Sequence, residues 1–380
     1  MITKIKLDNF KSLVNFELPL SQFNCLVGLN GSGKSTVLQG IDFISQLMSG
    51  EIDGWLAKRQ WAAADLNSKL TKKNNISFEV HIIDKEFNEI IWSGSVNRSS
   101  LKCTQEEVRC NGNVLLRVDD ASYFVVAKNG EGSKASIVFD YQGSILSRFK
   151  ESLIAHELDE LKSSISEILS LELISPELLR TRNKASQGKL GLGGEKLSAF
   201  LHESGDIVKE ELKDDLTKVY GQLNRIDTRS LRSGWKQLEI TENFAGHTVK
   251  SSARHINDGM LRLMAIFSQL RSKTDFLLFD EIENGINPEL IEYLIDHLVQ
   301  ARHQVIVTTH SPLILNYIED EVAREGVIYL YKNNLGITCS RKLFDIPSLN
   351  EKLSVMGPGE AFIDTDLTKL YEEIQMLGLS

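Results

Sequence analysis

The chain has 380 residues, and its 42% hydrophobic and 25% charged residues are typical of a globular protein that can bury a sizeable core. The formal net charge of −9 argues against a free-standing, non-specific DNA-binding protein, whose surface is usually basic, but it leaves room for a local basic groove made on dimerisation. No apolar run is long enough to span a bilayer, the N-terminus lacks a secretion signal, and the cysteines form no CxxC pair, so we expect a reduced, cytoplasmic chain without a membrane partner.

The N-terminal part predicts a strand, a second strand, a glycine-rich turn and a helix. Ile2–Leu7 alternates apolar and polar residues, as a half-buried strand does. Phe23–Val27 is a short apolar run, typical of a buried parallel strand, and Thr36–Met48 carries apolar residues at helical spacing. Between them, Gly28–Ser35 reads GLNGSGKS and fits the P-loop pattern GxxxxGK(S/T) at every defined position, in the strand–turn–helix context that this pattern requires.

The residue types of this motif suit the binding of ATP. The glycines let backbone N–H groups turn inward around a phosphate, and the helix N-terminus adds its positive dipole. Lys34 would reach the β- and γ-phosphates, and Ser35 would supply one oxygen ligand to Mg²⁺. The candidate nucleotide-binding residues here are Gly28, Asn30, Gly31, Ser32, Gly33, Lys34, Ser35 and Thr36.

The next part of the chain predicts an antiparallel lobe. Short alternating segments are separated by polar turns, and the expected strands cover residues 77–83, 89–96, 114–118, 122–127 and 135–141.

Residues 144–173 change to a helical period, which predicts an ordinary amphipathic helix, with a short coiled-coil-like arm as the alternative. Residues 181–194 are rich in glycine and lysine and predict a mobile loop, and a helix is expected over 197–223. Arg180 and Arg182 could contact a phosphate or DNA; solvated loop arginines are the alternative.

From Trp235 onward the pattern predicts alternating strands and helices. Two apolar runs, 276–280 (FLLFD) and 304–309 (QVIVTT), are each followed by a turn and a helix, which predicts parallel strands with crossover helices. Asp280, at the end of the first run, is expected to join Ser35 in binding Mg²⁺. Glu281 is expected to orient or deprotonate an attacking water, although such a pair can also be a strand end with exposed acids.

The order of the P-loop, 256–262 (INDGMLR), 276–281 (FLLFDE) and 308–312 (TTHSP) resembles that of the ABC-type ATPases. More closely, and with 9–12 (NFKS) near its start, it resembles the SMC/RecF/OLD-like branch, an AAA family ATPase with an ABC-type head. The resemblance implies an α/β P-loop NTPase fold with a mostly parallel core sheet, an antiparallel β-lobe and an inserted helical subdomain. The regions expected are the N-terminal half of the head (1–142), a helical insertion (143–235) and the C-terminal half of the head (236–380).

The resemblance also assigns further site residues. Asn257, Asp258 and Gly259 would form a signature loop that binds the γ-phosphate held by a second subunit; the usual serine is replaced by Asn257, whose amide can still donate. His310 would contact the γ-phosphate, so that Lys34, Glu281 and His310 are the candidate catalytic residues. Lys11 would touch a phosphate or be a surface lysine, residues 283–288 resemble the loop that crosses the dimer interface, and Gln60 is a weak candidate for the Q-loop glutamine.

These features predict an ATP-hydrolysing switch that forms a homodimer or higher oligomer around two ATP molecules. It would associate with DNA or regulate an effector protein, a nuclease or toxin, in bacterial anti-phage defence or DNA repair. The alternatives are the nucleotide-binding subunit of an ABC transporter, an OLD-like nuclease-associated ATPase, and a scaffold that binds ATP without useful hydrolysis. Residues 364–366 (DTD) follow no apolar strand and are better explained as a helix N-cap than as a metal site.

Overall fold

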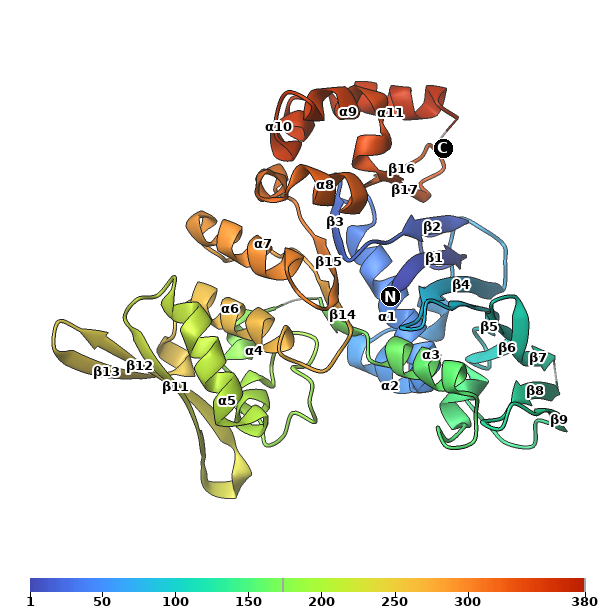
Figure 1. The fold of residues 1–380 in the computed structure, drawn as a ribbon, viewed down its shortest axis with the longest axis horizontal. Helices are drawn as coiled ribbons and strands as arrows, with labels where there is room; N and C mark the ends of the chain where they lie inside the picture. Colours follow the sequence, from blue (N-terminus) through green and yellow to red (C-terminus); the bar gives the residue numbers. More distant parts are fainter. Residues whose placement is uncertain (120, 173, 379–380) are drawn as a thin grey trace. The chain divides into compact units, whose positions relative to one another are not determined.

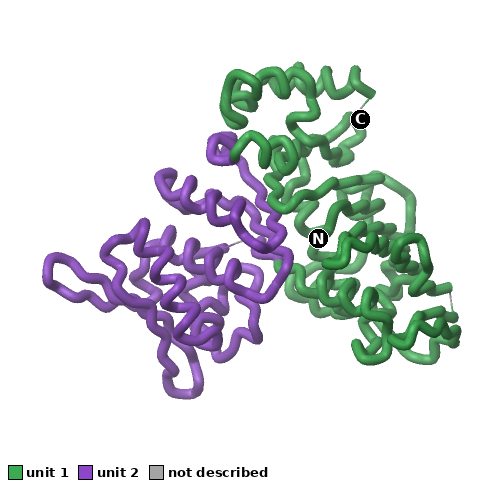
Figure 2. The backbone as a smooth tube through the Cα atoms, in the orientation of Figure 1, with its two compact units in different colours: residues 1–169, 319–380 green, residues 170–318 purple. Residues whose placement is uncertain are grey.

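The computed structural model describes residues 1–119, 121–172 and 174–378, which form two compact units (Figure 2). Unit 1 comprises residues 1–169 and 319–380, and unit 2 comprises residues 170–318. The boundaries expected after residues 142 and 235 do not coincide with these units. The reason is that the chain stays in unit 1 up to residue 169 and returns to it at residue 319.

An antiparallel sheet forms much of unit 1 (Figure 1). Its strand order is β2-β1-β4-β5-β6-β7-β8-β9, with β1 (Ile2–Asp8), β2 (Phe16–Pro19), β4 (Asn75–Ile83), β5 (Glu89–Asn97), β6 (Lys102–Cys110), β7 (Asn113–Asp119), β8 (Ser122–Val126) and β9 (Gly132–Ser136). The predicted antiparallel lobe is therefore confirmed. Two of its details were wrong, because the polar segment of β6 was not expected to be a strand and the strand expected at 135–141 is replaced by β9, which ends at Ser136.

A second group of strands in unit 1 carries the P-loop. The completely buried β3 (Phe23–Val27) pairs in parallel with β16 (Val327–Lys332), which pairs antiparallel with β17 (Thr338–Lys342). The chain leaves β3 through the glycine-rich turn and enters α1 (Lys34–Ser49), whose apolar residues are buried. The strand and helix predicted at this point are confirmed.

The remaining helices of unit 1 surround these sheets or follow β17. They are α2 (Ile52–Arg59), α3 (His156–Ser166), α8 (Asp320–Gly326), α9 (Pro347–Leu353), α10 (Pro358–Ile363) and α11 (Leu367–Met376). The helical prediction for residues 144–173 was too long: α3 follows a short 3₁₀ turn at Ile145–Arg148 and is followed by β10 (Leu169–Leu171), while Leu173 lies outside the described residues. Since α3 contacts α1 along its buried side, it is an ordinary packed helix and not an extended arm.

Unit 2 contains the parallel pair that was expected from its apolar runs. Strands β14 (Phe276–Phe279) and β15 (Gln304–Thr308) are completely buried and parallel, and α7 (Ile291–Val299) connects them. The other helices are α4 (Pro176–Leu179), α5 (Leu197–Thr217) and α6 (Asp258–Gln269). Residues 181–194 contain neither helix nor strand, as predicted.

A three-stranded antiparallel sheet in unit 2 was not predicted. It consists of β11 (Leu223–Ser230), β12 (Lys236–Phe244) and β13 (His247–Ser252), and β11 and β12 pack on α5 (Figure 1). The alternation of strands and helices that was expected from Trp235 onward therefore begins only at α6. Among the described residues, no helix combines the length and the apolar character needed to cross a membrane.

Candidate functional site

The P-loop of unit 1 forms a cradle that admits no side chain at two glycines. A Cβ atom at Gly28 would lie 2.2 Å from the carbonyl oxygen of Leu330 on β16. Gly33 has a φ of 111°, a value that favours glycine, and a Cβ atom there would lie 2.3 Å from Oγ1 of Thr338 on β17. The backbone can therefore pass close to its neighbours and turn its N–H groups toward a phosphate.

The Lys34 ammonium is folded back over the same loop. Its Nζ donates hydrogen bonds to the carbonyl oxygens of Gly28 at 2.7 Å and Leu29 at 3.2 Å, and the residue is only 4% exposed. Ser35 is exposed at the first turn of α1, where helix N–H groups lack partners within the helix. A positive charge and free N–H donors in one place make an anion site.

The hydroxyl groups of Thr338 and Ser12 support the P-loop backbone through hydrogen bonds. Thr338 Oγ1 donates to the carbonyl oxygen of Ser32 at 3.0 Å and lies 2.8 Å from the hydroxyl oxygen of Ser12. The Ser32 hydroxyl itself is buried and, within the part of the chain that the structure describes, has no hydrogen-bond partner. Sequence reasoning missed Thr338, which carries no motif and lies 306 positions from Ser32.

The other predicted nucleotide-binding residues of unit 1 have fewer contacts that indicate a phosphate site. Asn30 and Gly31 are exposed, and Thr36 is half-buried in the first turn of α1. The Lys11 ammonium donates to Oε1 of Gln39 at 2.8 Å and lies 3.2 Å from the ring centroid of Trp61, so a phosphate contact of Lys11 stays a prediction.

The acidic pair in unit 2 lies at the end of β14, as the sequence predicted. The Thr308 hydroxyl donates to the Asp280 carboxylate and accepts a 2.8 Å hydrogen bond from the backbone nitrogen of Glu281. Glu281 has a φ of 48°, a left-handed value that is strained for a residue with a side chain. Backbone strain of this kind clusters at active sites, and the Glu281 side chain is partly exposed beside His310.

The side chains of Glu281 and His310 lie together. Their nearest atoms, Oε1 and Nε2, are 3.3 Å apart, and Nδ2 of Asn284 donates to the other oxygen of Glu281 at 3.2 Å. Two of the three candidate catalytic residues are thus brought together within unit 2.

Glu283, the first residue of the segment 283–288, holds the loop that carries His310, a role that the resemblance of this segment did not predict. Oε1 of Glu283 accepts hydrogen bonds from the Thr309 hydroxyl at 2.9 Å, from the backbone nitrogen of His310 at 2.8 Å and from that of Ser311 at 3.1 Å. The sequence pointed to Glu283 only as part of the segment 283–288, and that resemblance does not reveal a contact 27 positions away.

The predicted signature loop begins α6 and faces solvent. Asn257 is the N-cap, and its Oδ1 accepts a hydrogen bond from the backbone nitrogen of Met260 at 2.8 Å. Asn257 and Asp258 are exposed, while Gly259 is half-buried, and a Cβ atom there would lie in tight contact, 3.3 Å from the Tyr220 hydroxyl. The loop is therefore accessible on unit 2, as a contact with a second subunit requires.

Two arginines flank this loop. Arg180 forms an ion pair with Asp258 and donates to the carbonyl oxygen of Ile256 at 2.8 Å. Arg262, one turn into α6, is half-buried, and burial lowers its pKa against the opposing charges of Asp258 and Glu281. Arg180 thus holds the start of α6 through Ile256 and Asp258.

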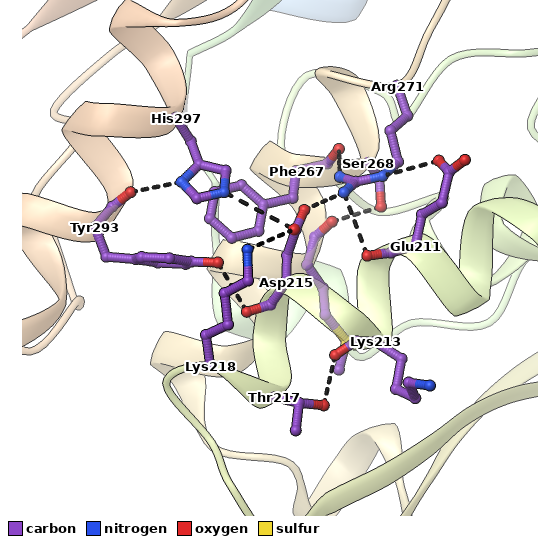
Figure 3. A network of polar contacts seen from close by, with 11 residues as sticks. Glu211, Lys213, Asp215, Thr217, Lys218, Phe267, Ser268, Arg271, Tyr293 and His297 are labelled. Carbon is purple, nitrogen blue, oxygen red and sulfur yellow. Dashed lines mark hydrogen bonds and ion pairs between the residues drawn. The ribbon is translucent and has the colours of Figure 1, made fainter.

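Farther along α6, a polar network ties this helix to α5 and α7 (Figure 3). The Asp215 carboxylate pairs with Arg271 and lies 3.9 Å from Nε2 of His297, and its backbone oxygen accepts from the Tyr293 hydroxyl at 2.9 Å. The His297 ring also stacks on Phe267 at 4.8 Å between centroids. The helix that starts at the signature loop is thus fixed at its far end.

Each unit therefore brings together its own part of the predicted site. Unit 1 holds Lys11 and the P-loop candidates, and unit 2 holds Asn257, Asp258, Gly259, Asp280, Glu281 and His310. The convergence of both sets on one triphosphate stays a prediction.

Similarity to known proteins agrees with this site. Residues 23–316 match the family described as "AAA domain, putative AbiEii toxin, Type IV TA system". The OLD nuclease of Thermus scotoductus is 20% identical over 341 residues, which cover 85% of this chain and 61% of that protein. The energy-dependent translational throttle protein EttA of Mycobacterium tuberculosis is 23% identical over 162 residues, 42% of this chain and 27% of that protein. The chain thus spans less than two thirds of the length of either relative.

The fold is similar to that of a solved Smc head domain. The Pyrococcus furiosus Smc head with an extended coiled coil, bound to the C-terminal domain of ScpA, gives a TM-score of 0.54 at 15% identity, over 93% of this chain and 99% of that one. The α/β P-loop NTPase fold expected from the sequence is therefore confirmed. The chain belongs to the family matched by residues 23–316, and it is similar in sequence to an OLD nuclease and in fold to an Smc head domain.

Proposed function

We propose that this protein binds and hydrolyses ATP and uses the cycle as a conformational switch. The observation that carries the proposal is the Lys34 ammonium, held 2.7 Å from the Gly28 carbonyl inside a loop in which Gly28 and Gly33 admit no Cβ atom. A buried cation with nearby helix N–H groups fits a triphosphate, and the unpartnered Ser32 hydroxyl offers it a further polar contact. Bound ATP with Mg²⁺ supplies the transferable γ-phosphoryl group.

Hydrolysis is assigned to the residues at the end of β14. Glu281 would orient the attacking water and accept its proton, because its carboxylate is partly exposed and is held by Asn284 and His310. Asp280, fixed by the Thr308 hydroxyl, and Ser35 keep their proposed roles as Mg²⁺ ligands.

Dimerisation is proposed from the exposed signature loop. Asn257 and Asp258 are accessible, and the N-terminus of the 12-residue helix α6 carries a dipole that favours a phosphate. A γ-phosphate contact across two subunits would exist only with ATP, so hydrolysis would release the pair.

The role proposed for this switch is the control of an effector protein in the bacterial cytoplasm. The family description names a toxin of a type IV toxin–antitoxin system, and one relative is an OLD nuclease. These relatives support an effector that is a toxin or nuclease, in anti-phage defence or DNA repair. The four cysteines are free, which agrees with a reducing compartment.

Phosphate release and light scattering test the ATPase and the switch separately. Wild type should release phosphate from ATP with Mg²⁺ and should dimerise with ATP but not with ADP. Glu281→Gln should lower the turnover by about 100-fold or more and should hold the ATP-bound dimer. Glu86→Gln, an exposed acid at a turn of unit 1, is the matched control and should leave both measurements unchanged.

Two results would contradict the proposal. No phosphate release from wild type, even with candidate effector and DNA present, would exclude hydrolysis. A dimer that forms equally with ATP, ADP and no nucleotide would exclude the switch while leaving ATP binding intact.

A nuclease-associated ATPase is the second candidate, because the alignment with the OLD nuclease covers 85% of this chain. Incubation of the purified chain with plasmid and divalent metal separates the two. Cleavage by this chain alone would favour the second candidate; cleavage only after addition of a partner would favour the first.

A further inference from the structure

Three segments of unit 2 carry only positive charge. Residues 178–194, 228–238 and 243–257 contain no aspartate or glutamate, although the whole chain has a net charge of −9. The lysines and arginines in these segments are Arg180, Arg182, Lys184, Lys189, Arg229, Arg232, Lys236, Lys250 and Arg254. Such local concentration of one sign on an acidic protein indicates a site for an anionic partner.

The segments meet around Arg182. A hollow of about 390 Å³ is lined by Arg182, Leu231, Arg232 and Trp235. On its other side, Arg182 borders a smaller recess together with Arg254. The backbone nitrogen of Lys236 also donates to the carbonyl oxygen of residue 183 at 2.9 Å, which joins the first segment to β12. We call Arg182, Lys184, Arg232, Trp235, Lys236 and Arg254 the Trp235 surface.

An exposed tryptophan lies among these cations. Trp235 is 41% exposed, and the Lys184 ammonium lies 5.7 Å from the centroid of its ring. The tight turn before it is closed by hydrogen bonds between the backbones of Leu231 and Trp235 at 2.7 Å and of Gly234 and Leu231 at 3.2 Å. The turn therefore presents Arg232 and the indole in a defined arrangement.

The loop that carries Arg182 and Lys184 is held in place. The side chains of Thr181 and Asn183 both donate to the carbonyl oxygen of Glu195, each at 2.7 Å. Cations on an ordered loop lose less conformational entropy when they bind a partner.

The charges of this surface are not neutralised by the protein. Among the residues that the structure describes, none of its five cations forms an ion pair, whereas Arg180 pairs with Asp258 and Arg229 with Glu239 at 3.1 Å. The nearby His202 responds to the same field: burial, and then the charges of Lys236 and Lys209, lower its pKa.

We propose that the Trp235 surface binds single-stranded nucleic acid. The cations without ion-pair partners can attract the negative phosphates of a nucleic-acid backbone, which does not require a fixed spacing between the charges. The exposed indole offers a face on which an unpaired base can stack. An acidic peptide would satisfy the cations but would leave the indole without a planar partner, so the aromatic residue favours nucleic acid. This inference goes beyond the proposed ATPase, because it requires neither Lys34 nor Glu281.

Fluorescence anisotropy with the full chain tests the proposal. The probes are labelled oligothymidylate and oligouridylate of about 20 nucleotides, a duplex of equal length, and polyglutamate as competitor. Wild type should bind the single strands more tightly than the duplex, with an affinity that falls as salt rises, and the two single-stranded probes distinguish DNA from RNA. Binding should quench the emission of Trp235, because Trp55 and Trp92 are buried and Trp61 is half-buried.

The variants separate stacking from charge. Trp235→Ala should weaken binding about fivefold or more, and Trp235→Tyr should restore part of it, because a ring can still stack. Arg182→Ala with Arg232→Ala should weaken binding about tenfold or more and should flatten the salt dependence. The matched control is Lys128→Ala with Lys134→Ala, which removes two exposed cations from unit 1 and should change neither quantity.

Binding of a fluorescent ATP analogue, measured on every variant of the Trp235 surface and on the control, checks that each of them is folded. Lys34→Ala should lose ATP binding and keep oligonucleotide binding, so failure of either proposal is seen separately. The proposal is overturned if wild type binds no single strand, if Trp235→Ala binds as wild type does, or if polyglutamate binds as tightly as the oligonucleotides.

Discussion

The carboxylate of Glu283 lies 2.8 Å from the backbone nitrogen of His310 and accepts its hydrogen bond. The same oxygen accepts from Thr309 and Ser311, so one acid organises the whole turn that follows β15. Because Glu281 is only two residues away, the acid proposed to act on water and the acid that holds His310 leave the same strand end. The position of His310 beside Glu281 therefore depends on Glu283.

Glu283→Ala should release this turn. The substitution leaves three donors without their acceptor. A hydrogen bond to a charged group contributes about 1.5–3 kcal/mol to stability. We expect the free energy of unfolding to fall by about 2 kcal/mol in urea denaturation, together with a loss of ATP turnover. Glu289→Ala, an exposed acid in the same part of the chain, is the control and should match wild type. A Glu283 variant with wild-type stability and turnover would show that the turn is held by other contacts.

Thr338→Val should loosen the P-loop without changing the volume of the side chain. It removes the hydroxyl that donates to Ser32 at 3.0 Å and lies 2.8 Å from the hydroxyl of Ser12. One such hydrogen bond contributes about 1 kcal/mol, so we expect the affinity for ATP to fall about fivefold, measured by titration with a fluorescent analogue. Thr248→Val makes the same chemical change on the exposed strand β13 and should leave the affinity unchanged. An unaltered affinity in the Thr338 variant would mean that the glycines alone shape the loop.

Local patterns predicted the parts of the site that are continuous in sequence. The P-loop follows from glycines and a lysine within eight positions, and β14 and β15 follow from apolar runs that only a buried strand explains. The position of Asp280 and Glu281 could be predicted because they directly follow the last residue of β14. These features need no knowledge of what packs against them.

The features that sequence reasoning missed depend on distant partners. Thr338 acts on a residue 306 positions away and has no local signal. Glu283 lies in the recognised segment 283–288, but its contact with a residue 27 positions away could not be read from that segment. Strand β6 is rich in polar residues, and one of them, the buried Glu106, accepts hydrogen bonds from Trp92 and Ser144 that no local pattern reveals. The sheet β11–β13 has largely exposed side chains on β13, so its apolar alternation is weak.

Asp215→Asn should destabilise unit 2 through the network around α6. The carboxylate pairs with Arg271 and lies near His297, and its side chain is only 18% exposed (Figure 3). An amide keeps the shape but loses the charge opposite Arg271, so we expect the free energy of unfolding to fall by about 1–3 kcal/mol. Asp214→Asn, whose side chain is 69% exposed, changes the neighbouring residue in the same way and should have little effect. Equal unfolding midpoints for the two variants would show that Asp215 contributes no more than a surface acid.

Glu106 and Glu107 should give unfolding stabilities with opposite dependence on pH. Burial raises the pKa of the Glu106 carboxyl above its ordinary value of 4.5, although Ser144, the Ile145 backbone and Trp92 donate hydrogen bonds to it. The folded chain therefore holds this proton more tightly than the unfolded chain. The stability that the group contributes is fully present below pH 4.5 and is lost as the pH rises through the raised pKa. Glu106→Gln cannot ionise, so its stability relative to wild type should increase as the pH rises.

The pKa of the adjacent Glu107 is shifted in the opposite direction. Burial again opposes ionisation, but hydrogen bonds from Arg109 and Arg117 outweigh it and hold the pKa below 4.5. Its contribution is present above pH 4.5 and is lost in acid, so Glu107→Gln should lose stability relative to wild type as the pH rises. Urea denaturation across this range, followed by the emission of the buried Trp92, measures both variants on one strand. If the stability of both variants relative to wild type changed with pH in the same direction, burial in the sheet, and not the partner of each carboxylate, would decide whether the protonated or the ionised form is favoured.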